Sequence, residues 1–465
     1  MSLQFNQVSP KVVPPLDPGF TPLVLANRQF REAVKASGHG VPLAIVVERG
    51  DGTRSRYDAA VFPSGTADAD NLRYVERLVK TLLWTRGGWK VYVGGPAEIG
   101  EAIKTMYAPG GARAFDALEV MGRVYEQEFT VVPCAIDEVP PANESTMAVG
   151  GHLEGCRIGL DLGASDRKVA AVIDGEAVYD EEVVWDPRPQ TDPQYHFDEI
   201  MTALKTAASH MPRVDAIGVS SAGIYVNNYV RIASLFRGVP RELFDTRIKN
   251  LFFEVQQAWG GIPLEVVNDG EVTALAGALS LEEGGVIGVA MGSSEAGGYV
   301  TPKGLITNWL NELAFVPIDA NPNAPIDEWS GDIGCGALYL SQQCVGRLIE
   351  PAGIEVDPAL GLPEKLKAVQ KLMAAGDPRA VPIYETVGAY LGYALAYYAD
   401  FYDIKHALVL GRVTSGDGGD IIIRVAQEVL SKEFPELAAM QVALPDEKSR
   451  RVGQAIAAAS LPAVK

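Results

Sequence analysis

Apolar and polar residues follow each other along the first third of the chain in short blocks that predict alternating strands and helices. The first block alternates with a period of two on either side of Gly50-Asp51-Gly52, as a β-hairpin does. The next has apolar residues at helical spacing. The expected elements are a hairpin at 41–62, helices at 71–84, 97–107 and 113–125, and strands at 90–95 and 129–134. They predict a small α/β module over residues 26–136, after an extended, proline-rich arm at 1–25.

The pattern breaks at residues 137–155, which are rich in turn formers and are interpreted as a linker. Strands then follow one another, and helices and further strands come after them. The expected strands lie at 157–163, 167–174, 176–185, 214–221 and 263–268. A second set of strands starts within 284–304, and a further strand ends before Gly411. Three strands followed by helix and strand occur twice, which predicts two similar α/β halves around a cleft, at 156–285 and 286–465.

Composition narrows the classes of function. The chain has 465 residues, a formal net charge of -19 and a pI near 4.8, so long-range repulsion disfavours binding to nucleic acid and to anionic membranes. No apolar run is long enough to span a bilayer, and no signal peptide is recognised at the N-terminus. The 4 cysteines form no C-x-x-C pair, as expected of reduced thiols in a cytoplasmic protein.

Residues 266–278, VVNDGEVTALAGA, place a carboxamide and a carboxylate between a strand and a helix. Asn268 or Asp269 can cap the helix, because a side-chain oxygen there accepts from its first free N–H groups. The same position, beyond the carboxyl end of a strand, is where ligands bind in α/β proteins. The two roles are compatible.

Three glycine-rich turns follow apolar strands. The first is Asp161-Leu162-Gly163-Ala164-Ser165, where small residues let backbone N–H groups approach a phosphate and Asp161 can hold Mg²⁺, directly or through water. The second is Gly292-Ser293-Ser294, and the third begins at Gly411 after a buried strand. Each turn alone is equally typical of a simple hairpin or strand-to-helix connection.

The order of these motifs resembles that of the ROK family of sugar kinases and sugar-responsive repressors, in the actin and hexokinase superfamily, over roughly residues 156–462. Asp161 to Ser165 are similar to D-x-G-G-T, Asn268 to Leu275 to N-D-A-N-x-A-A-L, and Gly292 to Gly298 to G-T-G-x-G-G-G. Glu312 begins a partial counterpart of E-x-G-H. The Asn-Asp stretch is the most specific of these matches.

The resemblance implies two ribonuclease H-like halves and an ATP- and Mg²⁺-dependent kinase of a sugar-like substrate, forming a homodimer. It implies roles for individual residues. Asp269 is the expected general base, and Asn268 and Glu312 are the expected substrate contacts. The expected nucleotide and phosphate contacts are Asp161, which also holds Mg²⁺, and Gly163, Ser165, Gly292, Ser293, Ser294 and Gly411.

The sequence also departs from the family's pattern. In the run Glu328 to Cys335, which is similar to the zinc motif C-x-C-G-x-x-G-C, Cys335 is the one retained cysteine, and Phe315 stands at the histidine position. Zinc is therefore not expected. Phe315 and Ala337 replace two polar sugar contacts, which leaves the acceptor open. Glu295 in the second turn would repel a γ-phosphate, unless Mg²⁺, Arg167 or Lys168 offsets its charge.

Three alternatives remain. Glu295, Phe315, Ala337 and Arg412, which replaces a glycine of the adenosine turn, favour a catalytically inactive sensor or regulator of sugar or nucleotide. An enzyme of the same superfamily acting on a carboxylate or acyl group is a second. A DNA-binding repressor is disfavoured by the acidic composition, and the module at 26–136 does not resemble a winged helix.

Overall fold

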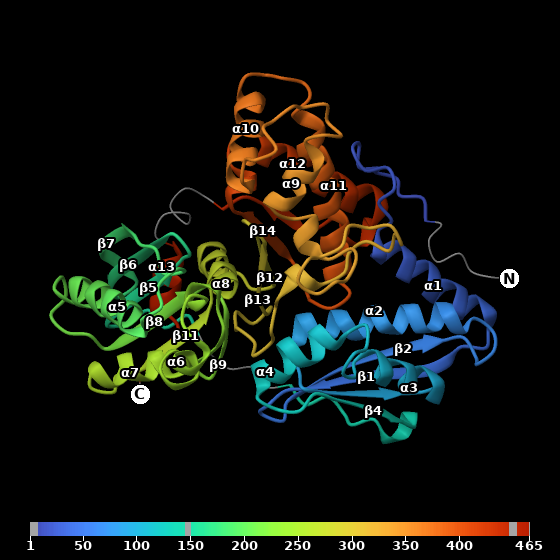
Figure 1. Cartoon of the computed structure of the whole chain (residues 1–465), viewed down its shortest axis with the longest axis horizontal. Coiled ribbons are helices and arrows are strands. Elements are labelled where there is room, and N and C mark those ends of the chain that lie inside the picture. Colours follow the sequence, from blue (N-terminus) through green and yellow to red (C-terminus); the bar gives the residue numbers. More distant parts are fainter. Residues whose placement is uncertain (1–7, 145–149, 446–452, 465) are drawn as a thin grey trace. The chain divides into compact units, whose positions relative to one another are not determined.

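The computed structural model describes residues 8–144, 150–445 and 453–464 (Figure 1). Backbone contacts divide the chain into two units, each assembled from several stretches of sequence. The larger unit contains Met1–Ser145, Val289–Gly297 and Trp309–Leu444, and the smaller unit contains Thr146–Gly288, Gly298–Asn308 and Pro445–Lys465. Each unit is described by itself.

The smaller unit is built on a five-stranded sheet with the order β11-β8-β5-β6-β7. Its strands are β5 (Cys156–Leu162), β6 (Asp166–Ile173), β7 (Glu176–Val184), β8 (Ala216–Ser221) and β11 (Leu264–Asn268). β5, β6 and β7 form an antiparallel meander, whereas β8 and β11 run parallel to β5. A mixed sheet with three parallel strands at one side gathers the carboxyl ends of β5, β8 and β11 at one edge.

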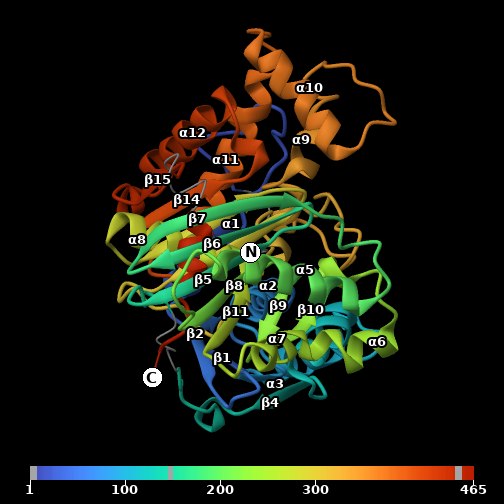
Figure 2. The same ribbon diagram turned by 90° about the vertical axis from the view of Figure 1, so that its left-hand side faces the viewer.

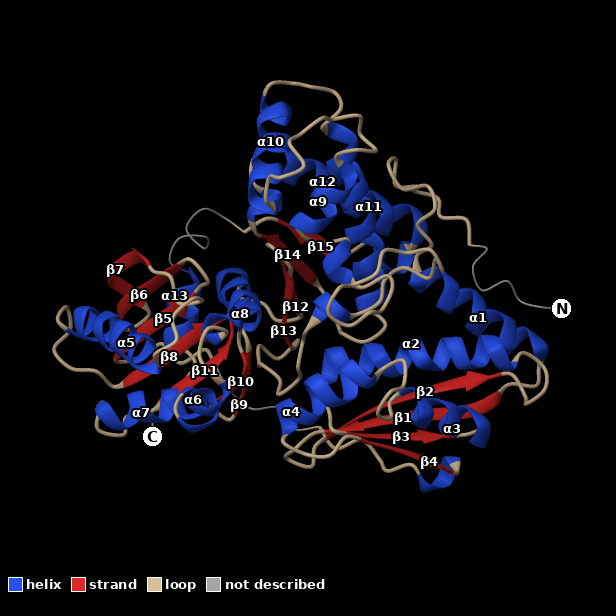
Figure 3. Ribbon diagram, viewed as in Figure 1, coloured by secondary structure: helices blue, strands red, loops and turns tan. Residues whose placement is uncertain are grey.

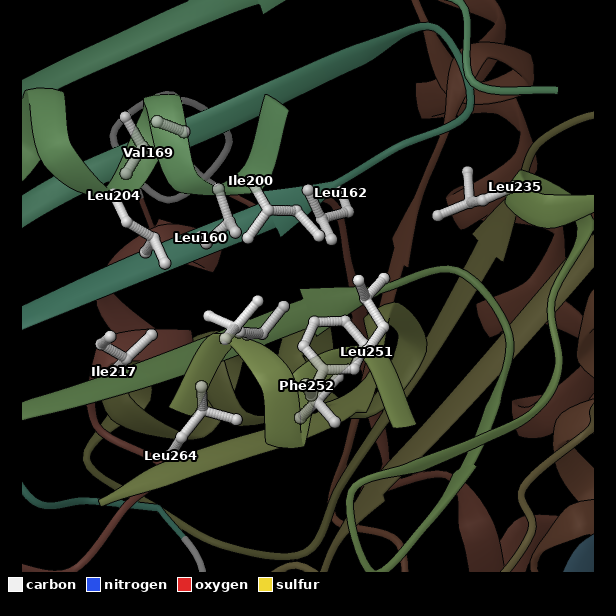
Figure 4. Packing of buried hydrophobic residues seen from close by; sticks show 14 of the residues in the cluster. Leu160, Leu162, Val169, Ile200, Leu204, Ile217, Leu235, Leu251, Phe252 and Leu264 are labelled. Carbon is white, nitrogen blue, oxygen red and sulfur yellow. The ribbon is translucent and has the colours of Figure 1, made fainter. Parts of the chain in front are cut away.

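The main core of the smaller unit lies between this sheet and the helices α5 (Pro193–Ala208) and α7 (Leu251–Ala258). Figure 4 shows Leu160 and Leu162 of β5 facing Ile200 and Leu204 of α5, together with Phe252 of α7. These side chains are buried, and alternate positions of β5 and β6 supply the sheet side of the core, as the two-residue period of a strand requires.

The opposite face of this sheet is covered by α13 (Gln454–Ala459) and α8 (Asp269–Leu281), which also pack on each other. Figure 1 labels α13, in red, among the green strands of this sheet, and Figure 2 shows β5, β6 and β7 side by side. The approach of α13 depends on two glycines. A Cβ at Gly159 would lie 1.7 Å from the carbonyl oxygen of Ala455, and one at Gly218 would lie 1.6 Å from that of Ala458.

The first sheet of the larger unit has the order β2-β1-β3-β4. Its elements are α1 (Leu23–Ser37), β1 (Val41–Glu48), β2 (Arg54–Val61), α2 (Asp68–Arg86), β3 (Lys90–Gly94), α3 (Ala97–Met106), the π-helical turn η1 (Phe115–Met121), α4 (Gly122–Tyr125) and β4 (Thr130–Cys134). α2 runs along the sheet (Figure 3), and 14 of its 19 residues are buried. An ordinary surface helix buries one stripe, so α2 is an interior helix of this unit.

In its described residues, the remainder of the larger unit contains four α-helices, and the second sheet, with the order β13-β12-β14-β15, includes strands of this region. The elements are α9 (Gln342–Leu348), α10 (Leu362–Ala374), α11 (Val381–Tyr398), α12 (Asp417–Glu433), β14 (His406–Leu410) and β15 (Gln441–Ala443). Of β12 (Val286–Met291) and β13 (Glu295–Val300), residues 289–291 and 295–297 belong to this unit. The described part of the N-terminal arm packs against α11, where Leu16 N–H donates to Thr386 Oγ1 (3.1 Å) and Val12 N–H to Tyr393 (3.3 Å).

The predicted hairpin at 41–62, the strands and most helices are confirmed within a few residues. The helix expected at 113–125 is a π-helical turn followed by one short α-helix. None of the helices in residues 8–144, 150–445 and 453–464 combines the length and hydropathy that a bilayer span requires.

The units do not follow the expected segments one for one. The expected module shares a unit with most of the expected second half, and residues 453–464 of that half pack in the smaller unit. Parts of the expected arm, linker and second half, namely 1–7, 145–149, 446–452 and 465, lie outside the described residues. The module and the linker as separate domains therefore stay predictions.

Candidate functional site

The parallel strands of the smaller unit bring the expected catalytic residues to one edge of the sheet. In the register of these strands, Asp161 of β5 stands opposite Ser220 of β8, and Ser220 stands opposite Val267 of β11. Asn268 and Asp269 are the next two residues after Val267. Residues 107 positions apart in the sequence, Asp161 and Asn268, are thus separated by one strand.

Asp161 is a buried carboxylate that is held by a neighbouring hydroxyl. Its side chain is 8% exposed, and Ser220 Oγ donates a hydrogen bond of 2.6 Å to Asp161 Oδ1. Burial raises the pKa of Asp161 above its ordinary value, although the Ser220 hydrogen bond and the nearby Lys168 act in the opposite direction. A cation at this carboxylate would offset the cost of its burial.

Asn268 ends β11 and caps α8, as the sequence predicts for one of the two positions. Its Oδ1 accepts from Gly270 N–H at 2.8 Å, and its Nδ2 donates to the carbonyl of Gly223 at 2.7 Å. Both ends of the carboxamide are therefore used within the smaller unit. This fixes the side chain and the direction in which the chain enters α8.

Asp269 is the first residue of α8 and is partly exposed. Gly270 N–H donates to Asp269 Oδ1 at 3.0 Å, while Thr273 Oγ1 donates to the Asp269 carbonyl at 2.8 Å. Burial and the charge of Asp161 raise the pKa of Asp269 to about 6, despite the hydrogen bond from Gly270. A carboxylate with a pKa close to neutrality is well matched to accepting a proton from a hydroxyl during a reaction.

The turn after β5 is a tight β-hairpin. Gly163 N–H donates to the carbonyl of Asp166 (3.0 Å), and the Trp185 indole N–H donates to the carbonyl of Gly163 (2.9 Å). Ser165 is exposed, and its hydroxyl donates to Asp166 Oδ2 at 3.1 Å. Because the Gly163 N–H is used inside the hairpin, a phosphate held here would have to contact other amides or the Ser165 hydroxyl.

In the larger unit, the two other glycine-rich turns follow neighbouring strands. Gly292 comes directly after β12 and Gly411 directly after β14, and these strands are adjacent in their sheet. Gly411 has a φ of 101°, and a Cβ there would lie 2.5 Å from the carbonyl oxygen of Met291, so a larger residue does not fit. Gly292 N–H donates to the Ser294 carbonyl at 2.9 Å, which closes a turn that contains Ser293.

Glu312 lies in the larger unit, at the C-terminal end of α2. The backbone N–H groups of Leu310, Asn311 and Glu312 donate to the carbonyls of Arg86, Thr85 and Trp84, at 3.3, 3.1 and 3.0 Å. Carbonyls in the last turn of a helix have no partner within the helix, so this loop segment satisfies them. The position of the Glu312 backbone is set by α2.

Phe315, which stands where the resembling proteins have a histidine, is stacked on Trp84 of α2, with ring centroids 4.2 Å apart. The Trp84 indole N–H donates to Asp116 Oδ1 at 3.1 Å, which fixes the plane of the stack. Phe315 therefore packs against a residue from the N-terminal part of the chain. Ala337 is buried in the turn η6 (Gly336–Leu338).

The structure corrects the expectation for Glu295. The residue begins β13, is 3% exposed, and accepts a hydrogen bond of 3.0 Å from the hydroxyl of Tyr398 of α11. Burial raises its pKa to about 8, with a contribution from Glu312. Its carboxyl is thus an interior group that is largely protonated at neutral pH, and the repulsion expected from it is absent. Arg167, an expected source of compensation, is paired with Glu199 at 2.9 Å.

Some residues of this site were missed by the sequence analysis. Ser220 and Ser221 end β8, and Ser221 Oγ lies 2.6 Å from the Tyr225 hydroxyl. A strand that ends in two hydroxyl residues, VSS, was the available signal. Arg412 is exposed, and its expected effect on a nucleotide base stays a prediction. Among the residues that the structure describes, no group of three or more His, Cys, Asp and Glu is arranged to hold a metal ion.

Neither a protein-family model nor a curated protein matches this sequence. Solved structures do match. A ROK hexokinase from Thermus thermophilus aligns with a TM-score of 0.51 and 18% identity, over 65% of this chain and 96% of the hexokinase. A ROK family transcriptional regulator, described as a homologue of the E. coli MLC protein, aligns with a TM-score of 0.50 and 20% identity, over 66% of this chain and 78% of the regulator.

A third match is a Listeria monocytogenes protein that has been provisionally described as an N-acetylmannosamine kinase, with a TM-score of 0.50 and 14% identity, over 65% of this chain and 97% of that chain. These identities establish a fold and not an activity. These matches agree with the resemblance to the ROK family and with the α/β class predicted from the sequence. The chain has a ROK-like α/β fold and is widely diverged in sequence.

Proposed function

We propose that this chain is an ATP- and Mg²⁺-dependent phosphotransferase that acts on a hydroxyl of a sugar or sugar-like acceptor, with Asp269 as the general base. The observation that carries the proposal is the pair Asp161 and Asp269. Both lie at the carboxyl edge of one sheet, and each carboxylate has a raised pKa. The charges of these two carboxylates are not fully offset by neighbouring cations. One carboxylate is therefore suited to binding a metal ion, and the other to accepting a proton.

Asp269 has the protonation behaviour that the role requires. With a pKa of about 6 it is mostly ionised at neutral pH and still basic enough to take a hydroxyl proton late in the transfer. The transition state of phosphoryl transfer is loose, so positioning supplies most of the rate. The double hydrogen bonding of Asn268 to Gly270 and Gly223 holds the strand-to-helix corner that carries Asp269.

The residues at Asp161 fit a magnesium ion. Mg²⁺ in nucleotide sites is held by one or two carboxylates, with phosphates and water as the remaining ligands, so a larger cluster of protein ligands is not required. Bound Mg²⁺ would neutralise part of the negative charge of the phosphates. Gly163, Ser165, Gly292, Ser293, Ser294 and Gly411 are the proposed phosphate and nucleotide contacts, and Asn268 and Glu312 the proposed acceptor contacts.

The proposal is tested by separating nucleotide binding from turnover. A ligand that binds the native state raises the melting temperature by mass action. We expect Mg²⁺-ATP to raise it for the native chain and for Asp269→Asn, and not for Asp161→Ala. ADP release with a panel of sugars and polyols should fall by about 10²- to 10⁴-fold in Asp269→Asn. The exposed β7 variant Glu176→Gln is the control. Full turnover by Asp269→Asn would refute the general-base role.

A second candidate is a sensor that binds a sugar or nucleotide without turning it over. The observation in its favour is the Phe315–Trp84 stack, which fills a position of the resemblance where a polar contact is expected. In that case sugars or Mg²⁺-ATP would raise the melting temperature of the native chain, but no acceptor in the panel would release ADP.

A further inference from the structure

A group of six charged side chains lies buried in the larger unit, close to the loop that carries Glu312. Three are cations and three are anions, so their formal charges balance. No side chain in the group is more than 11% exposed. We call this group the charge cluster; its members are Glu76, Arg77 and Lys80 of α2, Arg113, Asp116 of η1, and Asp332.

Asp332 is the member that comes from the C-terminal part of the chain, and all three cations contact it. Its carboxylate lies 3.0 Å from Arg77, 3.2 Å from Lys80 and 2.8 Å from Arg113. These cations hold the pKa of Asp332 well below its usual range, although its burial acts in the opposite direction. Asp332 is thus ionised and attached to α2 and to Arg113 over the whole physiological pH range.

The remaining contacts connect the cations to acids of the N-terminal residues. Glu76 lies 2.5 Å from Arg77 and 2.6 Å from Arg113, and Lys80 lies 3.0 Å from Asp116. Asp116 also accepts from the Trp84 indole, whose ring is stacked on Phe315. The cluster is therefore continuous with the aromatic pair beside Glu312.

The loop from 310 to 335 is consequently attached to α2 at several points. Its beginning satisfies the last carbonyls of α2, Phe315 stacks on Trp84, and Asp332 enters the charge cluster. The Arg73 guanidinium also donates to the Ala320 carbonyl. Glu312 is the last residue of the first attachment. A buried set of paired charges adds little net stability, but it can select one arrangement of the groups that it joins.

The same loop contains the run from Glu328 to Cys335 that resembles a zinc motif, and its residues do not suit zinc. Glu328 is exposed, and the Ser330 hydroxyl lies 3.9 Å from the Cys335 sulfur. Cys335 is the one cysteine of this run and is buried, whereas a structural zinc site needs about four ligands. Zinc cannot be what holds this loop through these residues.

We infer that the charge cluster holds this loop in place, as a structural metal would. We infer further that residues 76–116 thereby position the part of the site that binds the acceptor. Arg77, Lys80 and Arg113 are positioning residues: they hold Asp332, and with it the loop that presents Glu312. The part of the inference that concerns the acceptor rests on the proposed function. The part that concerns the loop does not.

Two measurements on Asp332→Asn, which keeps the shape and removes the charge, test the inference. Amide hydrogen exchange in residues 310–335 should rise by about tenfold or more, because exchange reports local opening. The KM for the acceptor should rise by about 10- to 100-fold, the range found for residues that orient a ligand contact. The KM for Mg²⁺-ATP should stay within about twofold of the native value, since a positioning role is confined to the acceptor.

The matched control is Arg424→Gln, which breaks an exposed ion pair with Glu385 (3.4 Å) in the same unit and should change none of these quantities. If Asp332→Asn does not fold, Arg113→Gln removes one cation at the partly accessible edge of the cluster, and Arg113→Lys should restore most of the native behaviour. Native exchange in 310–335 for a folded variant overturns the inference. An equal rise in both KM values, or exchange raised throughout the unit, also overturns it.

The two proposals fail separately. Asp269→Asn should leave exchange in 310–335 at the native rate, because Asp269 belongs to the smaller unit. If the native chain transfers no phosphate, the exchange measurement alone decides whether the cluster holds the loop.

Discussion

Two groups of carboxylates in the described residues have pKa values that are shifted in opposite directions. Asp332 and Glu76 are surrounded by cations that lower their pKa values despite burial. Asp161 and Asp269 are brought together at the edge of the other unit's sheet. Burial raises both pKa values, and the charge of Asp161 adds to the rise at Asp269. A balanced group of charges is complete without a ligand. The negative charge of an unbalanced pair is neutralised by binding a cation or a proton. This difference in charge balance distinguishes structural carboxylates from candidate catalytic ones.

The largest effect is expected from unbalancing the charge cluster. Asp332→Ala leaves three buried cations facing two anions, and breaking a buried network in this way costs about 3–5 kcal/mol. Urea denaturation followed by tryptophan fluorescence measures the loss, because Trp84 lies beside the cluster. Arg424→Gln, on the surface, should cost about 0–1 kcal/mol. Equal losses of stability in Asp332→Ala and Arg424→Gln would show that the charge cluster contributes no more than an exposed ion pair.

A falling pH should protonate the unbalanced pair first and weaken the charge cluster only at lower pH. The folded pKa values of Asp332 and Glu76 are depressed, so their stabilising contribution is complete above the unfolded pKa of about 4 and is lost as the pH falls further. Hydrogen exchange in α2, measured downward from pH 5, should rise more steeply in the native chain than in Asp332→Asn. Parallel slopes would contradict this.

Asn268→Ala should destabilise the smaller unit by about 1–2 kcal/mol, because it removes the helix cap on Gly270 and the hydrogen bond to the Gly223 carbonyl. Asn268→Asp keeps the cap but adds a third carboxylate to the edge, so it should recover only part of the loss. Hydrogen exchange in α8 reports on both. A loss in Asn268→Asp as large as in the alanine variant would mean that the cap contributes little.

The smallest effect is expected at Asp269, and it has the opposite sign. The folded pKa of about 6 lies above the unfolded value, so the carboxylate costs stability increasingly as the pH rises from about 4 through 6. Asp269→Asn should therefore stabilise the apo protein at pH 8 by on the order of 1 kcal/mol, reduced by its partial exposure to solvent. The gain should vanish near pH 4. A destabilised variant at pH 8 would show that Asp269 is primarily structural.

The smaller unit was the more predictable of the two. Strand periodicity and the D-x-G and N-D motifs identified β5, β11 and the start of α8, because each of these features is local in sequence. The pairing of β5 and β11 through β8, which brings Asp161 and Asp269 together, is a property of the sheet order that periodicity does not contain. The hydroxyl of Ser220 was missed for the same reason.

The charge cluster was not predictable from the residues that form it. Glu76, Arg77 and Lys80 interrupt the apolar pattern of 71–84, and charges on an amphipathic helix normally face water. Their burial depends on Asp332, 255 positions further along the chain from Arg77. Glu295 was misjudged for a related reason: its position in a glycine-rich turn indicated a charged carboxylate near a phosphate, whereas its side chain is buried and accepts a hydrogen bond from Tyr398 of α11.

The attachment of α2 to residues 310–335 also affects the order in which parts of the chain fold during synthesis. At a synthesis rate of about 5–20 residues per second, the ribosome needs roughly 10 to 50 s to travel from Arg77 to Asp332. For most of that interval the three cations of the cluster face only Glu76 and Asp116, the last carbonyls of α2 lack the loop, and Trp84 lacks its stacking partner Phe315. The N-terminal third of the nascent chain therefore stays incompletely folded until this loop has been synthesised. Slowing translation between these points should lengthen its exposure to chaperones and proteases.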